Sequence, residues 1–289
     1  MHIQLATLSV SPYWTQESIL LAKTLRKFGG TLADAPLTVF HPQDQPLDDD
    51  TARQLAGLSA ETAPFDFDQD ARNFPLAVVP FGATAAEGHV PNADLLVWLL
   101  PDTLILNPPV DFLITESKQL AYRPVHHQNV GSVWGQPLDP FWQKIYAHCE
   151  VHEVYVFEMA TCYQESVRPY FNAGLLVTRP QNGLCRDWLE TFLNLHQHPD
   201  FVPFFEQQKY AVFLHQAVLA GVILNRYPQA ALAELPESYN YPLHMHTDYP
   251  AGHKPARLTD LVTARYERAA DLPELLLPFK DAAPIADLL

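Results

Sequence analysis

The sequence contains few cysteines, and their spacing is uninformative for metal or redox motifs. Cys149, Cys162 and Cys185 are the only cysteines among 289 residues, and no two of them stand in a C-x-x-C arrangement. An odd number of widely spaced cysteines argues against the disulfide framework of a small secreted domain. We therefore expect no disulfide framework and a reducing compartment.

Basic residues are also scarce. Lys and Arg total 18 against 33 Asp and Glu, which gives a formal net charge of −15. Nucleic acids and anionic membranes attract basic surfaces, so neither is expected as a partner. A nucleotide ligand stays compatible with this charge, because a metal ion or a few local donors suffice to bind phosphate.

Long apolar runs are absent. No stretch reaches the roughly 18 apolar residues of a transmembrane helix. Met1–Val10 has neither the basic start nor the long apolar centre of a signal peptide. We expect no membrane span and a cytoplasmic protein.

The first forty residues predict a β-α-β unit. His2–Val10 is rich in strand formers, and Ser11-Pro12 breaks the pattern. A helix is expected next, capped by Thr15 and ended by Gly29-Gly30, before a short strand at Leu37–Phe40. This order is typical of the start of a doubly wound sheet.

The remaining chain continues the alternation of strands and helices, with no repeat and no clear linker. Apolar runs predict further strands at Leu76–Pro80, Asp94–Leu100, Lys118–Tyr122 and Tyr170–Thr178. Helical patterns fall within Pro46–Asp70 and over Pro140–Cys149, Leu184–Leu195, Phe204–Gly221 and Thr259–Leu272. Val222–Asn225 fits a short strand or a helix end, and Leu235–Leu243 is expected to be a loop. We expect a single α/β domain, 1–289, whose central sheet carries helices on both faces.

Asp102 is unusual because it ends a continuous apolar strand. Charged side chains are rarely buried without a partner, and a hard cation such as Mg²⁺ or Mn²⁺ prefers oxygen ligands. The alternative is a turn, since Asp in Pro-Asp-Thr accepts local backbone hydrogen bonds. The residues alone favour the turn.

Other candidate binding residues have equally plain alternatives. His244 and His246 would lie on one face of a strand, a spacing that suits a metal, although 13 histidines make chance pairs common. Asn172 could bind sugar hydroxyls or cap a strand start, and Tyr13 could stack on a base or cover the edge of the core. His215 fits a buried core residue as well as a ligand contact.

Four segments, in order, resemble the GT-A glycosyltransferases, and most closely the glycogenin-like retaining family. They lie between residues 6 and 246 and read ATLSVSPYW, DLLVWLLPDTLILNPPVDFL, YFNAGLLVTRP, and HQAVLAGVILN followed by LPESYNYPLHMH. The resemblance implies a Rossmann-related, mostly parallel sheet and transfer of a sugar, of the hexosyltransferase kind, from a nucleotide-diphospho-sugar to an acceptor that the sequence does not identify. It also implies a nucleotide-binding half, 1–115, and an acceptor and sugar half, 116–289, ending in a C-terminal helix.

Carried over position by position, the resemblance implies a set of site residues. The nucleotide would be held by Thr7, Ser9, Tyr13 and Lys254. The sugar would be lined by Asn172, Ala173, Gly174, His215 and Gln216, of which Asn172 and Gln216 would act in catalysis. A divalent cation, Mn²⁺ or Mg²⁺, would be bound by Asp102, His246 and His244.

Two residues depart from the family pattern. Leu100 stands where the first acid of the metal-binding Asp-x-Asp is expected, and His215 stands where an Asp precedes the Gln. These departures keep an alternative open, namely a catalytically degenerate nucleotide-sugar-binding or scaffold protein. A histidine-based metal protein is a third interpretation.

Overall fold

The computed structural model describes all 289 residues. A seven-stranded sheet forms its centre, in the order β10-β6-β9-β4-β1-β2-β3. Its strands are β1 Ile3–Leu8, β2 Leu37–Pro42, β3 Ala60–Phe65, β4 Leu95–Leu99, β6 Leu120–Pro124, β9 Phe171–Thr178 and β10 Leu232–Glu234. Pairing is parallel except that β9 runs antiparallel to both β4 and β6. The predicted mixed, mostly parallel sheet is therefore confirmed, and β1, β4 and β9 share it as expected.

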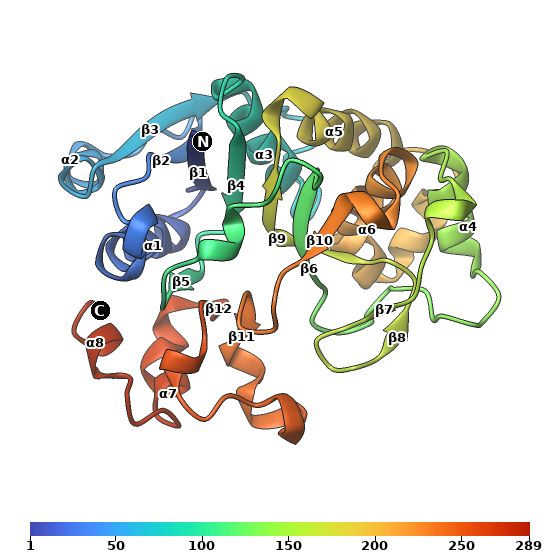
Figure 1. Ribbon diagram of the computed structural model, residues 1–289. Coiled ribbons are helices and arrows are strands. Elements are labelled where there is room, and N and C mark those ends of the chain that lie inside the picture. The colour runs from blue at the N-terminus through green and yellow to red at the C-terminus, as the bar shows by residue number, and fades with distance from the viewer.

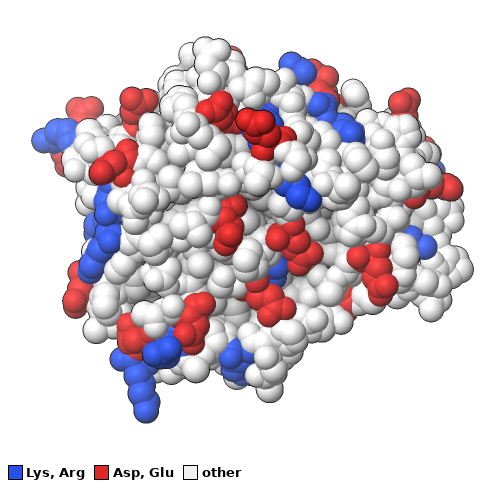
Figure 2. Space-filling view, in the orientation of Figure 1, with Lys and Arg blue, Asp and Glu red and all other residues white.

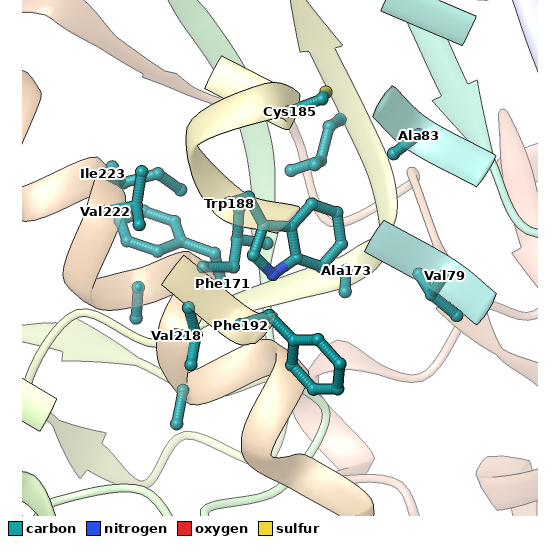
Figure 3. Close-up of a cluster of buried hydrophobic side chains, with 14 of the residues drawn as sticks. Val79, Ala83, Phe171, Ala173, Cys185, Trp188, Phe192, Val218, Val222 and Ile223 are labelled. Atoms are coloured by element: carbon teal, nitrogen blue, oxygen red, sulfur yellow. The ribbon is translucent and has the colours of Figure 1, made fainter. Parts of the chain in front are cut away.

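Helices cover both faces of this sheet (Figure 1). They are α1 Pro12–Phe28, α2 Asp49–Gly57, α3 Val78–His89, α4 Pro140–His148, α5 Leu184–Leu195 and α6 Gln208–Arg226. Side chains alternate along β4, so that Leu96 and Trp98 pack in the core under α3, α5 and α6, whereas Val97 packs in the core under α1. Figure 3 shows the first of these cores, where Trp188 of α5 is surrounded by side chains from α3, β9 and α6.

A smaller three-stranded sheet, β11-β12-β5, lies beyond the carboxyl end of β4. Its strands are β5 Thr103–Ile105, β11 Tyr241–Pro242 and β12 Thr263–Arg265, and the last helices, α7 Leu272–Leu276 and α8 Ala283–Ala286, pack beside it. A two-stranded ribbon of β7 Met159–Ala160 and β8 Ser166–Val167 completes the set. No helix is both long enough and apolar enough to cross a membrane.

Two predicted elements are wrong. Leu76–Pro80 is the approach to and first turn of α3, not a strand; α3 is buried between the sheet and α5, so its sequence is as continuously apolar as a buried strand. Thr259–Leu272 is not a helix: Thr263–Arg265 forms β12, because buried Thr263 and Ala264 pair with β5 and β11. The β3 strand at Ala60–Phe65 was not predicted.

Several boundaries also differ from prediction. Helix α1 begins at Pro12 and is capped by Ser11, whose hydroxyl accepts a hydrogen bond from the Trp14 amide, so Thr15 is not the cap. Helix α6 begins at Gln208 and runs to Arg226, which assigns Val222–Asn225 to a helix end. The loop predicted at Leu235–Leu243 contains the two residues of β11.

Charged side chains of both signs are interspersed on the face seen in Figure 2, with acidic residues over much of its centre. This distribution agrees with the net charge of −15. The viewed face thus lacks the continuous basic surface that a nucleic-acid partner requires.

Candidate functional site

The candidate site lies where β4 ends and the antiparallel strand β9 begins. The amide of Leu100 donates a hydrogen bond to the carbonyl of Gly174 over 2.9 Å, so the Asn-Ala-Gly segment runs directly beside the end of β4. Ligand sites of open α/β sheets occupy this edge, outside the carboxyl ends of the strands. A cavity of about 230 Å³ opens here.

The structure brings all five predicted sugar-site residues into this one cavity. Its lining comes from loops before α3 and after β6, from β9 and α6, and from the segment around β12. The lining residues are Leu76, Leu100, Val125, His126, His127, Asn129, Asn172, Ala173, Gly174, Phe213, His215, Gln216, His244, Met245, Arg265 and Glu267. That the five predicted residues bind a sugar remains a prediction.

Asn172 and Gln216 are held by different hydrogen bonds. The Oδ1 atom of Asn172 accepts a hydrogen bond from the Gly174 amide over 2.8 Å, and its Nδ2 atom makes no hydrogen bond to the protein. Gln216 accepts from the Ala173 amide over 3.1 Å and donates to the Tyr170 hydroxyl over 3.3 Å. Asn172 therefore offers a free donor to a ligand, whereas Gln216 mainly fixes the start of β9 against α6.

His215 is buried beside the indole of Trp188, in the helix α6. Its Nδ1 atom lies 2.9 Å from the carbonyl of Val212, and a carbonyl only accepts, so Nδ1 carries the proton. Burial lowers the pKa of His215 to about 4, which keeps the ring neutral at pH 7. Nε2 is then a hydrogen-bond acceptor without a protein partner, on a residue that lines the cavity.

Asp102 is buried and paired with a cation of the protein itself. Its Oδ2 atom lies 2.7 Å from Nη2 of Arg265 and accepts a hydrogen bond from the Glu267 amide over 3.2 Å. Antiparallel pairing of β12 with β5 places Arg265 opposite Thr103, the residue after Asp102. Sequence analysis did not point to Arg265, because its segment was predicted to be a helix.

The predicted metal ligands do not come together as one set. His244 lines the cavity with Nε2 at 3.3 Å from Glu267, whereas Nδ1 of His246 lies 2.9 Å from the Tyr241 hydroxyl and its ring packs against Phe279. The i, i+2 spacing does not align the two imidazoles, because Leu243–Asp248 is a 3₁₀ turn and not a strand. In this structure Asp102, His244 and His246 therefore do not form one set of metal ligands.

The structure contains one group of three side chains that could hold a metal ion, at His148, His198 and Asp200, away from the cavity. Lys144 already lies 2.8 Å from Oδ1 of Asp200, and His148 lies 2.9 Å from Oδ2. These two side chains lower the pKa of Asp200 to about 2. The carboxylate of Asp200 thus already has Lys144 and His148 as partners, without an added ion.

A buried acid, Glu17 of α1, lies behind the ion pair. Burial, followed by the charge of Asp102, raises the pKa of Glu17 to about 8. The Oε2 atom of Glu17 and the Tyr266 hydroxyl are buried without hydrogen-bond partners. In the sequence Glu17 only fitted the first turn of a helix, so its burial could not be foreseen.

The four predicted nucleotide residues are dispersed. Thr7 is fully buried within β1, and Lys254 donates to the Thr247 carbonyl over 2.9 Å in the C-terminal segment. Ser9 lines a second, larger cavity of about 580 Å³ between the starts of α1 and α2, where its hydroxyl lies 2.7 Å from that of Thr15. Tyr13 is 70% exposed and lines an adjoining hollow, which shares Gln16, Ile19 and Gln54 with that cavity.

The predicted convergence of Tyr13 with Asp102, Asn172 and Gln216 is therefore wrong for Tyr13. Because α1 begins at Pro12, Tyr13 is its second residue and turns toward solvent. Asn172 and Gln216 share the cavity, and Asp102 reaches it through Arg265.

Comparisons with known structures show the fold. A crystal structure of the galactosyltransferase LgtC with donor and acceptor sugar analogs is 14% identical, with a TM-score of 0.53, over 99% of this chain and 94% of that chain. An active-site glutamine mutant of LgtC is 12% identical, with the same TM-score and the same coverage of both chains. The bifunctional glycosyltransferase WbbM matches at 10% identity and a TM-score of 0.51, over 99% of this chain and 51% of that chain. The predicted GT-A fold is confirmed.

Sequence comparison assigns the family. No curated protein matches the chain. The family model of the Rhodobacterales glycosyltransferase domain matches residues 10–226, well over half of the sequence, and this range includes the strand before Asp102, the start of β9 and helix α6. The chain therefore belongs to the Rhodobacterales glycosyltransferase domain family.

Proposed function

We propose that this protein transfers a hexosyl group from a nucleoside-diphosphate sugar to a hydroxyl group of an acceptor, and that it does so in the cytoplasm. The observation that carries the proposal is the cavity at the end of β4, where an amide donor, a neutral imidazole acceptor and a guanidinium meet, from Asn172, His215 and Arg265. Sugar hydroxyls need both donors and acceptors, and a diphosphate needs positive charge.

The roles follow from the chemistry of each group. Asn172 Nδ2 donates to a sugar hydroxyl, His215 Nε2 accepts from another, and Gln216 positions the β9 backbone that lines the sugar. The nucleoside would enter the larger cavity beside Ser9, at the amino-terminal end of α1. In this arrangement residues 1–115 supply most nucleoside contacts, and residues 116–289 supply the sugar contacts.

In the reaction the bond between the anomeric carbon and the diphosphate oxygen breaks, and its electron pair stays on that oxygen. A new bond joins the anomeric carbon to the acceptor oxygen, and the acceptor proton is released. The products are a glycosylated acceptor, a nucleoside diphosphate and a proton. Positive charge beside the diphosphate accelerates the step, because it stabilises the negative charge that grows on the leaving oxygen in the transition state.

The experiment is a panel of UDP-, GDP-, ADP- and dTDP-hexoses, with release of nucleoside diphosphate measured as slow donor hydrolysis. One donor should give release above background, and Asn172→Ala should reduce it about 10-fold or more, the effect of losing one hydrogen bond made in the transition state. Asn92→Ala, at an exposed position before β4, is the matched control and should keep full activity. Binding of a donor without any release would instead support the degenerate interpretation, and absence of both would refute the proposal.

A further inference from the structure

Arg265 is fixed in the site by backbone pairing as well as by charge. Its strand, β12, pairs with β5 at Arg265 and Thr103, so the guanidinium and the Asp102 carboxylate approach from adjacent positions. The side chain is only 13% exposed, and Nη2 lies 2.7 Å from Asp102 Oδ2. A side chain so constrained is already ordered before a ligand binds, which lowers the entropic cost of binding.

The rest of the guanidinium faces the cavity. Nη1 lies over the Cα of Gly174, where any Cβ would overlap it, and it makes no hydrogen bond to the protein. Arg265 therefore uses Nη2 on Asp102 and leaves Nη1 free beside Asn172, whereas Nε is buried without a partner. A guanidinium N–H is a strong, permanently charged donor for a phosphate oxygen.

The same residues do not fit a divalent cation. The side chain of Leu100 has no lone pair to offer, and Oδ2 of Asp102 is engaged by Arg265 and by the Glu267 amide. No three possible ligand atoms lie together around Asp102. A cation bound there would also lie next to the guanidinium and be repelled by it.

We propose that Arg265, anchored by Asp102, takes the place of the divalent cation, so that the diphosphate of the donor binds without a metal. This inference rests on the proposed function. The charge balance is preserved, because one acid with one guanidinium is neutral, as are two acids with a divalent cation. When the bond to the anomeric carbon breaks, the electron pair remains on the diphosphate oxygen, and Arg265 donates to that oxygen while keeping its own proton.

The test is calorimetric titration of the 289-residue protein, freed of metal with EDTA, with UDP, GDP, ADP and dTDP. We expect one nucleoside diphosphate to bind, with a Kd that changes less than about threefold when Mn²⁺ is added. Binding that requires Mn²⁺, or that tightens tenfold or more with it, would overturn the inference and leave the proposed function standing. No binding in either condition would overturn both.

Variants then separate a binding role from a structural one. Arg265→Met leaves Asp102 unpaired, so the double variant Asp102→Asn with Arg265→Met is the safer test, since it removes both charges together. It should weaken nucleoside diphosphate binding about 10- to 100-fold, the effect of losing a charged hydrogen bond, while binding of the nucleoside alone changes little. Arg226→Met is the matched control, an arginine paired with Asp187 at the far end of α6. Equal weakening of diphosphate and nucleoside, or none of either, would refute the role of Arg265.

Discussion

Glu17 provides a direct test of the electrostatics beneath the site. Only 2% of this residue is exposed, and burial together with the nearby charge of Asp102 raises its pKa from 4.5 to about 8. The folded protein therefore holds a proton at neutral pH that the unfolded chain releases. Replacing the acid with the similarly shaped Gln in Glu17→Gln removes this titration and leaves the packing nearly unchanged.

The direction of the pH effect on stability follows from the linkage between proton binding and folding. A raised acid pKa means that the native state binds more protons than the unfolded state between pH 4.5 and about 8, so stability falls as pH rises through this window. Each pH unit costs about 1.36 kcal/mol, so the loss reaches about 3 kcal/mol at pH 6.5 and about 5 kcal/mol above pH 8. The Gln variant suffers no such loss.

The assay is urea unfolding of both proteins at pH 5, 6.5 and 8.5. Groups away from Glu17 titrate alike in the two proteins, so their difference in free energy of unfolding reports Glu17 and the residues coupled to it. The advantage of Glu17→Gln should be smallest at pH 5 and grow by several kcal/mol at pH 8.5. A difference that stays flat across this range would show that Glu17 is ionised in the folded protein and shares Arg265 with Asp102, which would refute the reasoning.

Two further predictions concern Gly174 and the cysteines. Gly174→Ala places a Cβ onto Nη1 of Arg265 and 3.0 Å from Oδ1 of Asn172. Urea unfolding should therefore show a free energy of unfolding lower by about 1–3 kcal/mol, as for other overpacked sites. Unchanged stability would mean that Arg265 does not lie over the glycine. Burial raises the pKa of Cys149 to about 12 and also raises those of Cys162 and Cys185, so iodoacetamide should modify no cysteine in the native protein and all three in urea, as measured by mass spectrometry. An adduct on the native protein would contradict the burial.

The sheet could be predicted because its signals are local: apolar runs located β1, β4 and β9. The sugar-site residues came from the resemblance to the GT-A glycosyltransferases, whose order of segments implied that they would meet at the carboxyl ends of the central strands. Asn172 and Gln216 do share one cavity. The antiparallel direction of β9 is what brings its first residues, rather than its last, to this edge.

The errors arise where a segment's environment, not its composition, decides its structure. Helix α3 is buried on two sides, so it has the same apolar run as a buried strand. Thr263–Arg265 becomes a strand only because β5 and β11 are there to pair with it. Tyr13 turns away from the cavity because the helix starts at Pro12, a difference of one turn.

Asp102 shows why the chemistry of the site needed the structure. A carboxylate buried at the end of an apolar strand needs either a positive partner or backbone donors, and that requirement is visible in the sequence. The sequence does not identify that partner, because a metal ion is not part of the sequence and Arg265 is one of many basic residues far along the chain. The pairing of β12 with β5 selects Arg265, and the small residue at Gly174 leaves room for its guanidinium. Leu100 and Arg265 then have a common explanation: once a guanidinium supplies the positive charge, an acid at position 100 would only add negative charge beside an anionic donor, in a cavity that Glu267 already lines.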